Sequence, residues 1–214
     1  MTIDRGKLVD AAARVYGEFG FRGATTRRIA DEAGVNEITI FRQFGSKEAL
    51  INEVVRTHAV RPPHPDLPIA PVDPQHELTE WAETVRAHMS DARSLIRRMM
   101  SEMEERPGVA PCVGEGPMHA AAQLHEYVAR LSVHGFLPPL ATSRAHDTPD
   151  RDAAASMLMS ALFADAMGRD MMPTMYPQPA ERAPAAYVRV FLAALGAQLP
   201  SSYTPAPSLR AGSV

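Results

Sequence analysis

Residues 21–50 read FRGATTRRIADEAGVNEITIFRQFGSKEAL, which predicts two short helices joined by a tight turn and followed by a third helix. We expect the first two helices at about 26–33 and 37–44, with Gly34 supplying the left-handed residue that such a turn requires. Residues with side-chain oxygens stand where each helix should begin. These expected N-caps are Thr25, Asn36 and Ser46. Two short helices joined by a glycine-containing turn are typical of a helix-turn-helix unit.

The second helix of this unit should have one apolar and one polar face. Ile40 and Phe44 are four residues apart and are expected to point into the core. In a helix-turn-helix that binds DNA, the N-terminal half of this helix enters the major groove and its exposed side chains read base edges. The expected base-reading face carries Glu37, Thr39, Arg42 and Gln43. The expected phosphate contacts are the backbone amides at Thr26 and Asn36 and the side chains of Arg27, Arg28 and Lys47. The two-helix pattern alone leaves DNA binding and a purely structural role open.

Residues 4–58, about a quarter of the chain, resemble the DNA-binding domain of the tetracycline-repressor (TetR) family of bacterial transcription regulators. Several features agree in register: the block FRGATTRRIADEAGV, an N-cap after the turn valine, a threonine three residues later, two aromatic residues and the motif SKEAL. The resemblance implies a homodimer that binds an operator through the helix at 37–44. It also implies that a small molecule, bound in a divergent C-terminal domain, releases the protein from that operator.

The sequence departs from the family pattern at two positions of the second helix. Ile38 stands where the family often has glycine, and its side chain either touches a thymine methyl group or packs against protein. Phe41 stands where the family usually has tyrosine, so it lacks the hydroxyl that would bond a phosphate. Both residues are nevertheless included among the expected DNA contacts.

The composition of the 214 residues excludes several classes of protein. The net charge is −3, yet residues 22–47 hold five Lys or Arg against three Asp or Glu. No stretch approaches the roughly 20 apolar residues of a membrane span, and the N-terminus lacks a signal-peptide pattern, so we expect a cytoplasmic protein. The single cysteine, Cys112, excludes an internal disulfide and a cysteine-rich metal site. No catalytic, cofactor or metal motif is recognisable, so we expect neither an enzyme nor a cofactor.

The apolar residues recur at helical spacing along the chain, which predicts an all-α fold of about nine helices. The prolines divide this fold into parts. The predicted parts are a helix-turn-helix DNA-binding domain at 1–60, a Pro-rich spacer at 61–73, a helical ligand-binding and dimerisation domain at 74–197, and a disordered tail at 198–214. Within the C-terminal domain, Asp73-Pro74, Pro117 and Thr148-Pro149 are expected to begin helices, and the stretch RPGVAPCVGEGP (106–117) is expected to be a loop.

Eleven of the twelve methionines lie between Met89 and Met175. They either fill an irregular core or line an adaptable apolar pocket for an unknown, largely apolar effector. The candidate pocket residues are Trp81, Val85, Met89, Met99, Met103, Leu124, His125, Val128 and Met157. A signal from this pocket to the DNA-binding domain would cross the joint near the Pro-rich spacer.

The segments 149–171 and 184–197 are apolar around more than half of each expected helix, which is more than one helix needs for its own core. The residues of this pattern are Ala154, Met157, Leu158, Ala161, Leu162, Asp165 and Gly168 in the first segment, and Tyr187, Val190, Phe191 and Ala194 in the second. We expect the two helices of each subunit to form a four-helix homodimer interface about a twofold axis, which demands a pseudo-palindromic operator on double-stranded DNA.

The function predicted from these features is a ligand-responsive transcriptional repressor. The alternative is a helical small-molecule carrier or interaction scaffold that does not bind DNA. Binding to duplex DNA that weakens steeply with salt separates the two hypotheses.

Overall fold

The computed structural model describes residues 4–60, 66–102, 110–138 and 150–198, and every regular element in these residues is helical. The nine α-helices of the described residues are α1 (Arg5–Gly23), α2 (Thr26–Ala33), α3 (Glu37–Phe44), α4 (Lys47–Val55), α5 (Pro74–Asp91), α6 (Arg93–Glu102), α7 (Ala110–Val133), α8 (Arg151–Gly168) and α9 (Ala183–Ala194). One π-helical turn, η1 (Arg56–Val60), continues α4, and two short 3-10 turns, Pro173–Met175 and Ala180–Arg182, lie between α8 and α9. The predicted all-α fold is confirmed.

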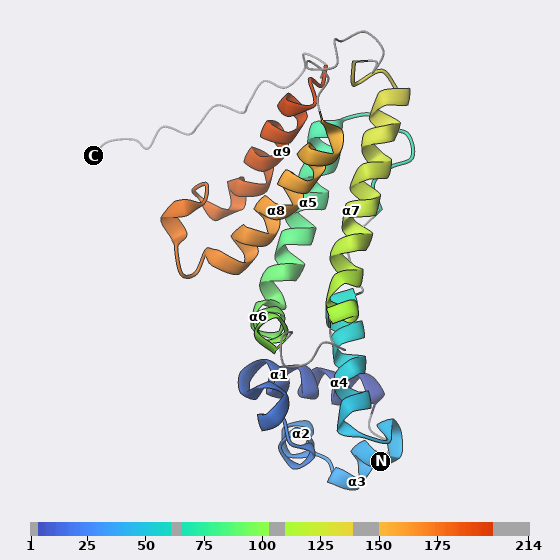
Figure 1. The fold of residues 1–214 in the computed structure, drawn as a ribbon, viewed down its shortest axis with the longest axis vertical. Helices are drawn as coiled ribbons and strands as arrows, with labels where there is room; N and C mark the ends of the chain where they lie inside the picture. Colours follow the sequence, from blue (N-terminus) through green and yellow to red (C-terminus); the bar gives the residue numbers. More distant parts are fainter. Residues whose placement is uncertain (1–3, 61–65, 103–109, 139–149, 199–214) are drawn as a thin grey trace, which may run out of the picture.

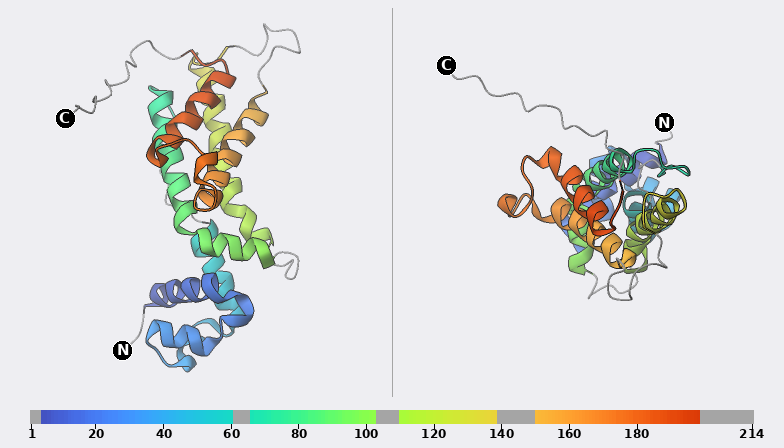
Figure 2. Two further views of the ribbon diagram at one scale, coloured as in Figure 1. Left: turned by 90° about the vertical axis from the view of Figure 1, so that its left-hand side faces the viewer. Right: turned by 90° about the horizontal axis from the view of Figure 1, so that it is seen from above.

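The molecule is elongated, with α1–α4 at one end and α5, α7, α8 and α9 packed side by side at the other (Figure 1). Helix α6 lies across the junction between these two groups, as the side view in Figure 2 shows.

Each group has its own apolar core. The N-terminal core is built by α1–α4 and contains Leu8, Ile29 and Ile40, none of which is exposed to solvent. Leu95 and Met99 of α6 are buried in this same core. The second core is built mainly by α5, α7, α8 and α9. Helix α6 therefore follows the spacer in the chain but belongs by packing to the N-terminal core.

The helix starts expected from the sequence have the expected caps. The side-chain oxygens of Thr25, Asn36 and Ser46 accept hydrogen bonds from backbone N–H groups in the first turns of α2, α3 and α4. Asp73 does the same for α5, whose first residue is Pro74. Because each cap satisfies an amide that the helix leaves unpaired, these short helices begin at defined residues.

Gly20 interrupts the helical backbone of α1. Gly20 has φ 69° and ψ 179°, so the helix kinks there, but α1 resumes and continues to Gly23. A positive φ favours glycine, because other residues would place a Cβ against their own backbone.

The expectation of a loop at 106–117 with a helix beginning at Pro117 is wrong for residues 110–117, and residues 106–109 lie outside the described residues. Helix α7 already begins at Ala110 and runs through Cys112 and Pro117. It packs against η1 and α8, and these tertiary contacts outweigh the poor helix propensity of Gly114, Gly116 and Pro117, whereas Pro111 lies in the first turn, where proline is tolerated. The expected helix start at Thr148-Pro149 lies outside the described residues, and the N-cap of α8 is Asp150.

The second half of the Pro-rich spacer, residues 66–73, is held against α7 and α5. Leu67 is buried, and its carbonyl accepts a hydrogen bond from Arg130 Nη1 at 3.0 Å. The backbone N–H groups of Val72 and Asp73 both donate to Glu77 Oε1, each at 2.9 Å. Residues 61–65 and the expected disordered tail from residue 199 onward lie outside the described residues.

Candidate nucleic-acid interface

The turn between α2 and α3 has the geometry that the sequence predicts. Gly34 adopts a left-handed conformation with φ 67° and ψ 36°. The N–H of Val35 donates to the carbonyl of Ala30 at 2.9 Å, which closes the turn, and Ile40 is fully buried behind it. The Thr26 hydroxyl donates a hydrogen bond to the Glu37 carboxylate, so the N-termini of the two helices are also linked through side chains. The two helices form a helix-turn-helix unit.

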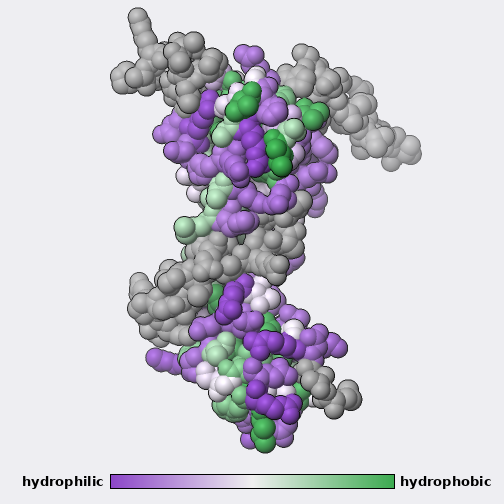
Figure 3. Space-filling model, turned by 90° about the vertical axis from the view of Figure 1, so that its right-hand side faces the viewer, coloured by the Kyte–Doolittle hydropathy of each residue, from purple (hydrophilic) through white to green (hydrophobic). Residues whose placement is uncertain are grey.

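The outer face of α3 is exposed and carries apolar groups beside a cation. Ile38 is 71% exposed and Phe41 is 49% exposed, and Arg42 is exposed next to Phe41. In Figure 3, apolar surface drawn in green reaches the lower tip of the molecule, the end at which α3 lies in Figure 1. Ile38 and Phe41 thus give the outer face of α3 two neighbouring exposed apolar groups beside a cation.

Three other expected base-reading residues on α3 are less accessible. Glu37, Thr39 and Gln43 are all half-buried. The carboxylate of Glu37 is the one linked to Thr26. Ile38, Phe41 and Arg42 are therefore the side chains of α3 best placed to reach a base edge.

The expected phosphate-binding cations differ in their surroundings. Arg27 is exposed on the first turn of α2. Arg28 donates to the carbonyl of Gly23 at 2.7 Å and lies over the ring of Phe19, with 4.2 Å from its guanidinium carbon to the ring centroid. Lys47 donates to the carbonyl of Phe21 at 2.9 Å, and its ammonium lies 4.0 Å from the Phe21 ring centroid.

These contacts give Arg28 and Lys47 a structural role, because they bond carbonyl groups where α1 ends and the chain turns to α2. Arg27 is the cation of the three with the most freedom to approach a phosphate. The Asn36 side chain is occupied as a cap, with Oδ1 2.9 Å from the N–H of Ile38. The predicted phosphate contacts of Thr26, Asn36 and the three cations stay predictions.

Arg5 is a residue of this region that the sequence analysis did not identify. Its Nη1 donates to the carbonyl of Gln43 at 2.9 Å, and its guanidinium carbon lies 4.1 Å from the centroid of the Phe44 ring. A second guanidinium nitrogen lies 3.9 Å from the Glu53 carboxylate on α4. Arg5 thus holds the C-terminal end of α3 against the start of α1. No local pattern could have shown this contact, because Arg5 and Gln43 are 38 residues apart.

The C-terminal end of α6 is bonded to the kink of α1. Glu102 accepts hydrogen bonds from the Tyr16 hydroxyl and from the backbone N–H of Phe21, both at 2.9 Å. Arg98 donates to the carbonyl of Glu18 at 3.2 Å. A Cβ at Gly20 would lie 2.7 Å from Glu102 Oε1, so the glycine provides the space in which this carboxylate sits. We call these contacts the α6–α1 clamp.

The nine candidate pocket residues do not all lie together. Five of them share the C-terminal core, namely Trp81, Val85 and Met89 of α5 and Leu124 and Val128 of α7. Met99 lies instead in the N-terminal core, because α6 turns its apolar face toward α1. Met157 is 69% exposed and belongs to the outer face of α8, and Met103 lies outside the described residues. His125 is exposed, with Nε2 3.5 Å from Asp152 Oδ1 and Nδ1 2.7 Å from the carbonyl of Ala121.

The apolar pattern of α8 and α9 divides between the inside of the subunit and its surface. Several residues expected at a dimer interface are buried in their own subunit: Ala154, Leu158, Leu162, Asp165, Gly168 and Phe191. Met157, Val190 and Ala194 remain exposed. The expectation that Leu158 and Phe191 belong to the dimer interface is therefore wrong, since these side chains fill the core between α8, α9 and α5.

Among the residues that the structure describes, no three His, Cys, Asp or Glu side chains are grouped so that they could hold a metal ion.

Within the same described ranges, no helix combines the length and the apolar character needed to cross a lipid bilayer.

The fold and the α2–turn–α3 geometry define a helical protein with an N-terminal helix-turn-helix unit. Residues 8–54 match the model of bacterial regulatory proteins of the tetR family. The resemblance of the N-terminal domain to the TetR family, which the sequence indicates, is thereby confirmed.

Several of the relatives that match this domain are named as transcriptional repressors. The chain is 40% identical over 52 residues to the HTH-type transcriptional repressor KstR2 of Mycobacterium tuberculosis, which is 24% of this chain and 26% of that protein. It is 37% identical over 60 residues to the HTH-type transcriptional repressor AcnR of Corynebacterium glutamicum, which is 28% of this chain and 32% of that protein. The chain thus matches about a quarter to a third of the length of these curated relatives.

Beyond the N-terminal domain the similarity is one of fold. The crystal structure of a transcriptional regulator from a Rhodococcus species superposes with a TM-score of 0.62, covering 92% of this chain and all of that one at 19% identity. The C-terminal helices therefore share an architecture with such regulators without sharing their sequence.

Proposed function

We propose that this protein is a ligand-responsive transcriptional repressor that binds a pseudo-palindromic operator as a homodimer. The observation that carries the proposal is the exposed face of α3, which presents Ile38, Phe41 and Arg42 to solvent. The helix is capped at its start by Asn36, and the carbonyl of Gln43 near its end accepts a hydrogen bond from Arg5. A short helix held in this way presents its side chains in a fixed register, which base readout requires. The named repressors among its relatives support repression rather than activation, and no part of the proposal involves catalysis or a cofactor.

The proposed DNA contacts divide into base readout and phosphate binding. Ile38 and Phe41 would touch thymine methyl groups, and Arg42 would donate two hydrogen bonds to guanine O6 and N7. Arg27 and the amide groups at the start of α2 would bind the backbone. Two such units in a dimer would place their α3 helices about one turn of DNA apart, roughly 34–36 Å.

Replacing Arg42 by alanine is expected to weaken binding to the preferred operator by about 1–3 kcal/mol. The effect on random duplex DNA should be much smaller, because the lost contact is with a base. The operator is first selected from a random duplex library with the full-length protein. The affinities of the wild type and of the Arg42→Ala variant for the operator and for random duplexes are then measured by fluorescence anisotropy. Arg56→Ala is the matched control, because Arg56 is exposed where α4 ends, away from α3, and lies outside the outer faces of α8 and α9. Equal losses on both duplexes would show that Arg42 contacts only phosphate.

The proposed dimer uses the outer faces of α8 and α9. Most of the exposed residues on these two helices are uncharged: Ala153, Ser156, Met157, Ser160 and Ala164 on α8, and Val190, Ala193 and Ala194 on α9, beside the charged residues Asp152 and Arg189. Small residues allow two helix pairs to approach closely, and a twofold axis makes such a face self-complementary.

Val190→Asp is expected to convert the dimer into a monomer that keeps its helical circular dichroism. Val190 is 66% exposed in the subunit, so the aspartate costs little in the monomer but would be buried in the dimer without a partner, a penalty of about 3 kcal/mol or more. Sedimentation velocity gives the state of association. Val133→Asp is the control, because Val133 is 84% exposed on α7, and that variant should remain dimeric. A dimeric Val190→Asp variant would exclude this interface.

The proposed effector site lies where α5 and α7 face each other. Trp81, Val85, Met89, Leu124 and Val128 belong to one buried apolar cluster there, and the indole Nε1 of Trp81 lies 3.4 Å from Gln123 Oε1. A largely apolar molecule that separates these two helices would disturb the packing of α8 against α5. Because Trp81 is the only tryptophan of the chain, its fluorescence reports directly on such binding.

The α6–α1 clamp supports a route from this site to DNA. At one end of α6, Arg93 Nε donates to the carbonyl of Ala166 on α8 at 2.6 Å, and Arg97 donates to the carbonyl of Met167. At the other end, Glu102 is bonded to α1. A movement of α8 would therefore shift α6 and, through α1, the position of α3. An effector would weaken DNA binding by its differential affinity for the two arrangements, typically about 1–3 kcal/mol.

A further inference from the structure

The connection between α8 and α9, residues 169–182, carries an unusual concentration of exposed apolar side chains. Met171 is 63% exposed, Met172 43% and Met175 69%. Together with Met157 and Val190 they make up five of the 13 large apolar side chains exposed in the described residues. The α8–α9 connection stands out from the helix bundle at the left of Figure 1, and the view from above in Figure 2 shows it extending beyond α8 and α9.

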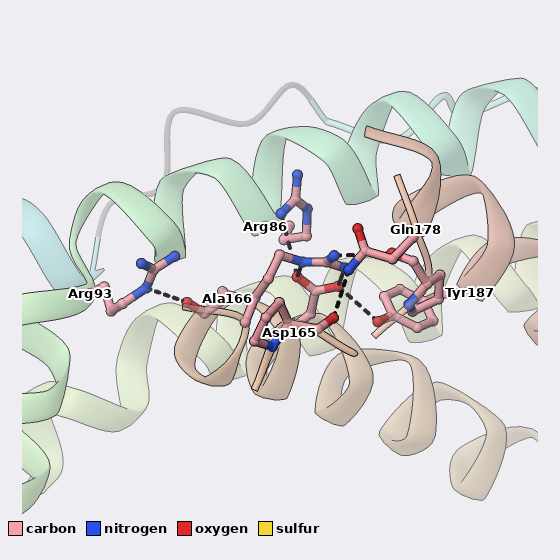
Figure 4. A network of polar contacts seen from close by, with 9 residues as sticks. Arg86, Arg93, Asp165, Ala166, Gln178 and Tyr187 are labelled. Carbon is pink, nitrogen blue, oxygen red and sulfur yellow. Dashed lines mark hydrogen bonds and ion pairs between the residues drawn. The ribbon is translucent and has the colours of Figure 1, made fainter. Parts of the chain in front are cut away.

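This connection is held in place from inside the subunit. Asp165 is fully buried near the end of α8, and its carboxylate accepts hydrogen bonds from Arg169 Nε at 2.7 Å and from the Tyr187 hydroxyl at 2.8 Å (Figure 4). Arg86 Nη1 of α5 approaches the same carboxylate at 3.4 Å. Arg169 in turn donates from Nη1 to the carbonyl of Pro177 at 3.0 Å. The Asp165 carboxylate thereby holds Arg169 in the position from which it binds the carbonyl of Pro177 in the connection.

Further contacts fix both ends of the connection. A Cβ at Gly168 would lie 2.1 Å from the Tyr176 hydroxyl, so the tyrosine packs directly on the glycine backbone. Gln178 Nε2 donates to the carbonyl of Pro173 at 2.6 Å. Asp170 is paired with Arg97 of α6, with Nη1 3.1 Å from Oδ2. The exposed methionines are thus presented by an ordered segment, and not by a chain that could fold them away from water.

We propose that the α8–α9 connection is an arm that binds a second copy of this chain, with Met171, Met172 and Met175 covering the partner subunit beside the α8 and α9 faces. The proposal rests on the homodimer proposed above. The occupant is a second copy because the connection joins α8 directly to α9, so its methionines border the outer faces of these two helices, whose exposed residues are mostly alanine and serine. Such small side chains bury little area, whereas a stable interface buries about 800 Å² per partner.

An ordered arm also binds at a lower entropic cost than a flexible one, because the conformation that contacts the partner already exists in the free subunit. The hydrogen-bond network around Asp165 would therefore strengthen dimer formation as well as stabilise the subunit. In a twofold dimer each subunit would contribute one arm and receive one, so every contact would occur twice.

The test compares two sets of Met→Gln substitutions in the full chain, because glutamine keeps the length of methionine and removes its apolar character. The triple variant Met171→Gln, Met172→Gln, Met175→Gln is expected to raise the dimer dissociation constant about 10- to 100-fold in sedimentation equilibrium. The control pair Met100→Gln, Met118→Gln replaces exposed methionines of α6 and α7 and should leave the constant unchanged. Circular dichroism of both variants confirms that the subunit is folded.

A second measurement uses the wild-type protein. Peroxide oxidation followed by mass spectrometry should find the three arm methionines protected above the dissociation constant and reactive below it, with Met118 reactive at both concentrations. An unchanged constant in the triple variant, or equal reactivity at both concentrations, overturns the arm and points to another occupant. If Val190→Asp dissociates the dimer while the triple variant does not, the proposed dimer stands and the arm alone fails. A monomeric wild-type protein contradicts both.

Discussion

Asp165→Asn is expected to lower the free energy of unfolding by about 3–5 kcal/mol, the usual cost of removing one partner from a buried ion pair. The substitution would leave Arg169 and Arg86 facing a neutral amide in a position that has no exposure to solvent. The amide can accept a hydrogen bond but cannot balance the charge. Urea denaturation followed by circular dichroism measures the loss.

The control for this variant is Asp170→Asn, which removes an ion pair with Arg97 at the surface of the same connection. Its side chain is 42% exposed, so solvent screens the pair and the loss should be small. Similar losses of unfolding free energy in both variants would show that burial does not account for the stabilisation by Asp165.

The acid sensitivity of the protein gives a second check on Asp165. Burial alone would raise the pKa of this carboxyl, but hydrogen bonds from Arg169 and Tyr187 and the charges of Arg169 and Arg86 outweigh it and hold the pKa below its ordinary value. A lowered pKa in the folded state stabilises the protein above the unfolded value of about 3.9, and the stabilisation is lost as the pH falls through the folded value. The Asp165→Asn variant should therefore lose less stability than the wild type when the pH is lowered below about 4. An identical acid dependence would contradict this assignment.

Gly20→Ala is expected to destabilise the protein by about 2–4 kcal/mol, because it combines backbone strain with a steric clash. Alanine at φ 69° strains the kink of α1, and its Cβ would meet Glu102 Oε1 at 2.7 Å and Arg98 Cδ at 3.2 Å. The carboxylate would have to leave the N–H of Phe21, which opens the α6–α1 clamp.

Gly135→Ala shows the effect of an alanine at positive φ without a steric clash. Gly135 has a similar φ of 79°, but a Cβ there would meet nothing within 4 Å, so only the backbone strain of about 1–2 kcal/mol should appear. Urea denaturation of the two variants is compared under one set of conditions. Equal losses would mean that Glu102 moves aside freely and that the clamp contributes little.

The helix-turn-helix unit could be predicted from the sequence because its determinants are local. The caps at Thr25, Asn36 and Ser46 each bond an amide two or three residues away, and the turn depends on the single conformation of Gly34. The roles of Lys47 and Arg5 could not be predicted in the same way. Their partners are 26 and 38 residues distant, and a surface cation near DNA is compatible with either phosphate binding or a structural bond.

The C-terminal half could be predicted as helical, but the surroundings of its residues could not. Apolar periodicity places Leu158 and Phe191 on a buried helix face, but it does not show whether their own subunit or a second subunit covers that face. The placement of Met99 has the same cause, because no pattern in α6 shows that its apolar face meets α1 rather than α5. The buried position of Asp165 was also missed, since an isolated aspartate in an apolar helix has no local signal for its arginine and tyrosine partners.

The salt dependence of binding to duplex DNA tests the central claim, that α3 and its neighbours form a DNA-binding surface. The full-length protein is titrated with the selected operator and with random duplexes across a range of salt concentrations. We predict that the protein binds the operator tightly and random duplexes more weakly. In both cases the logarithm of the binding constant should fall linearly with the logarithm of the salt concentration, with a slope of about −0.9 for every phosphate neutralised. Absence of binding to any duplex at low salt, or binding that does not change with salt, would contradict the account and favour a helical carrier that uses this fold without DNA.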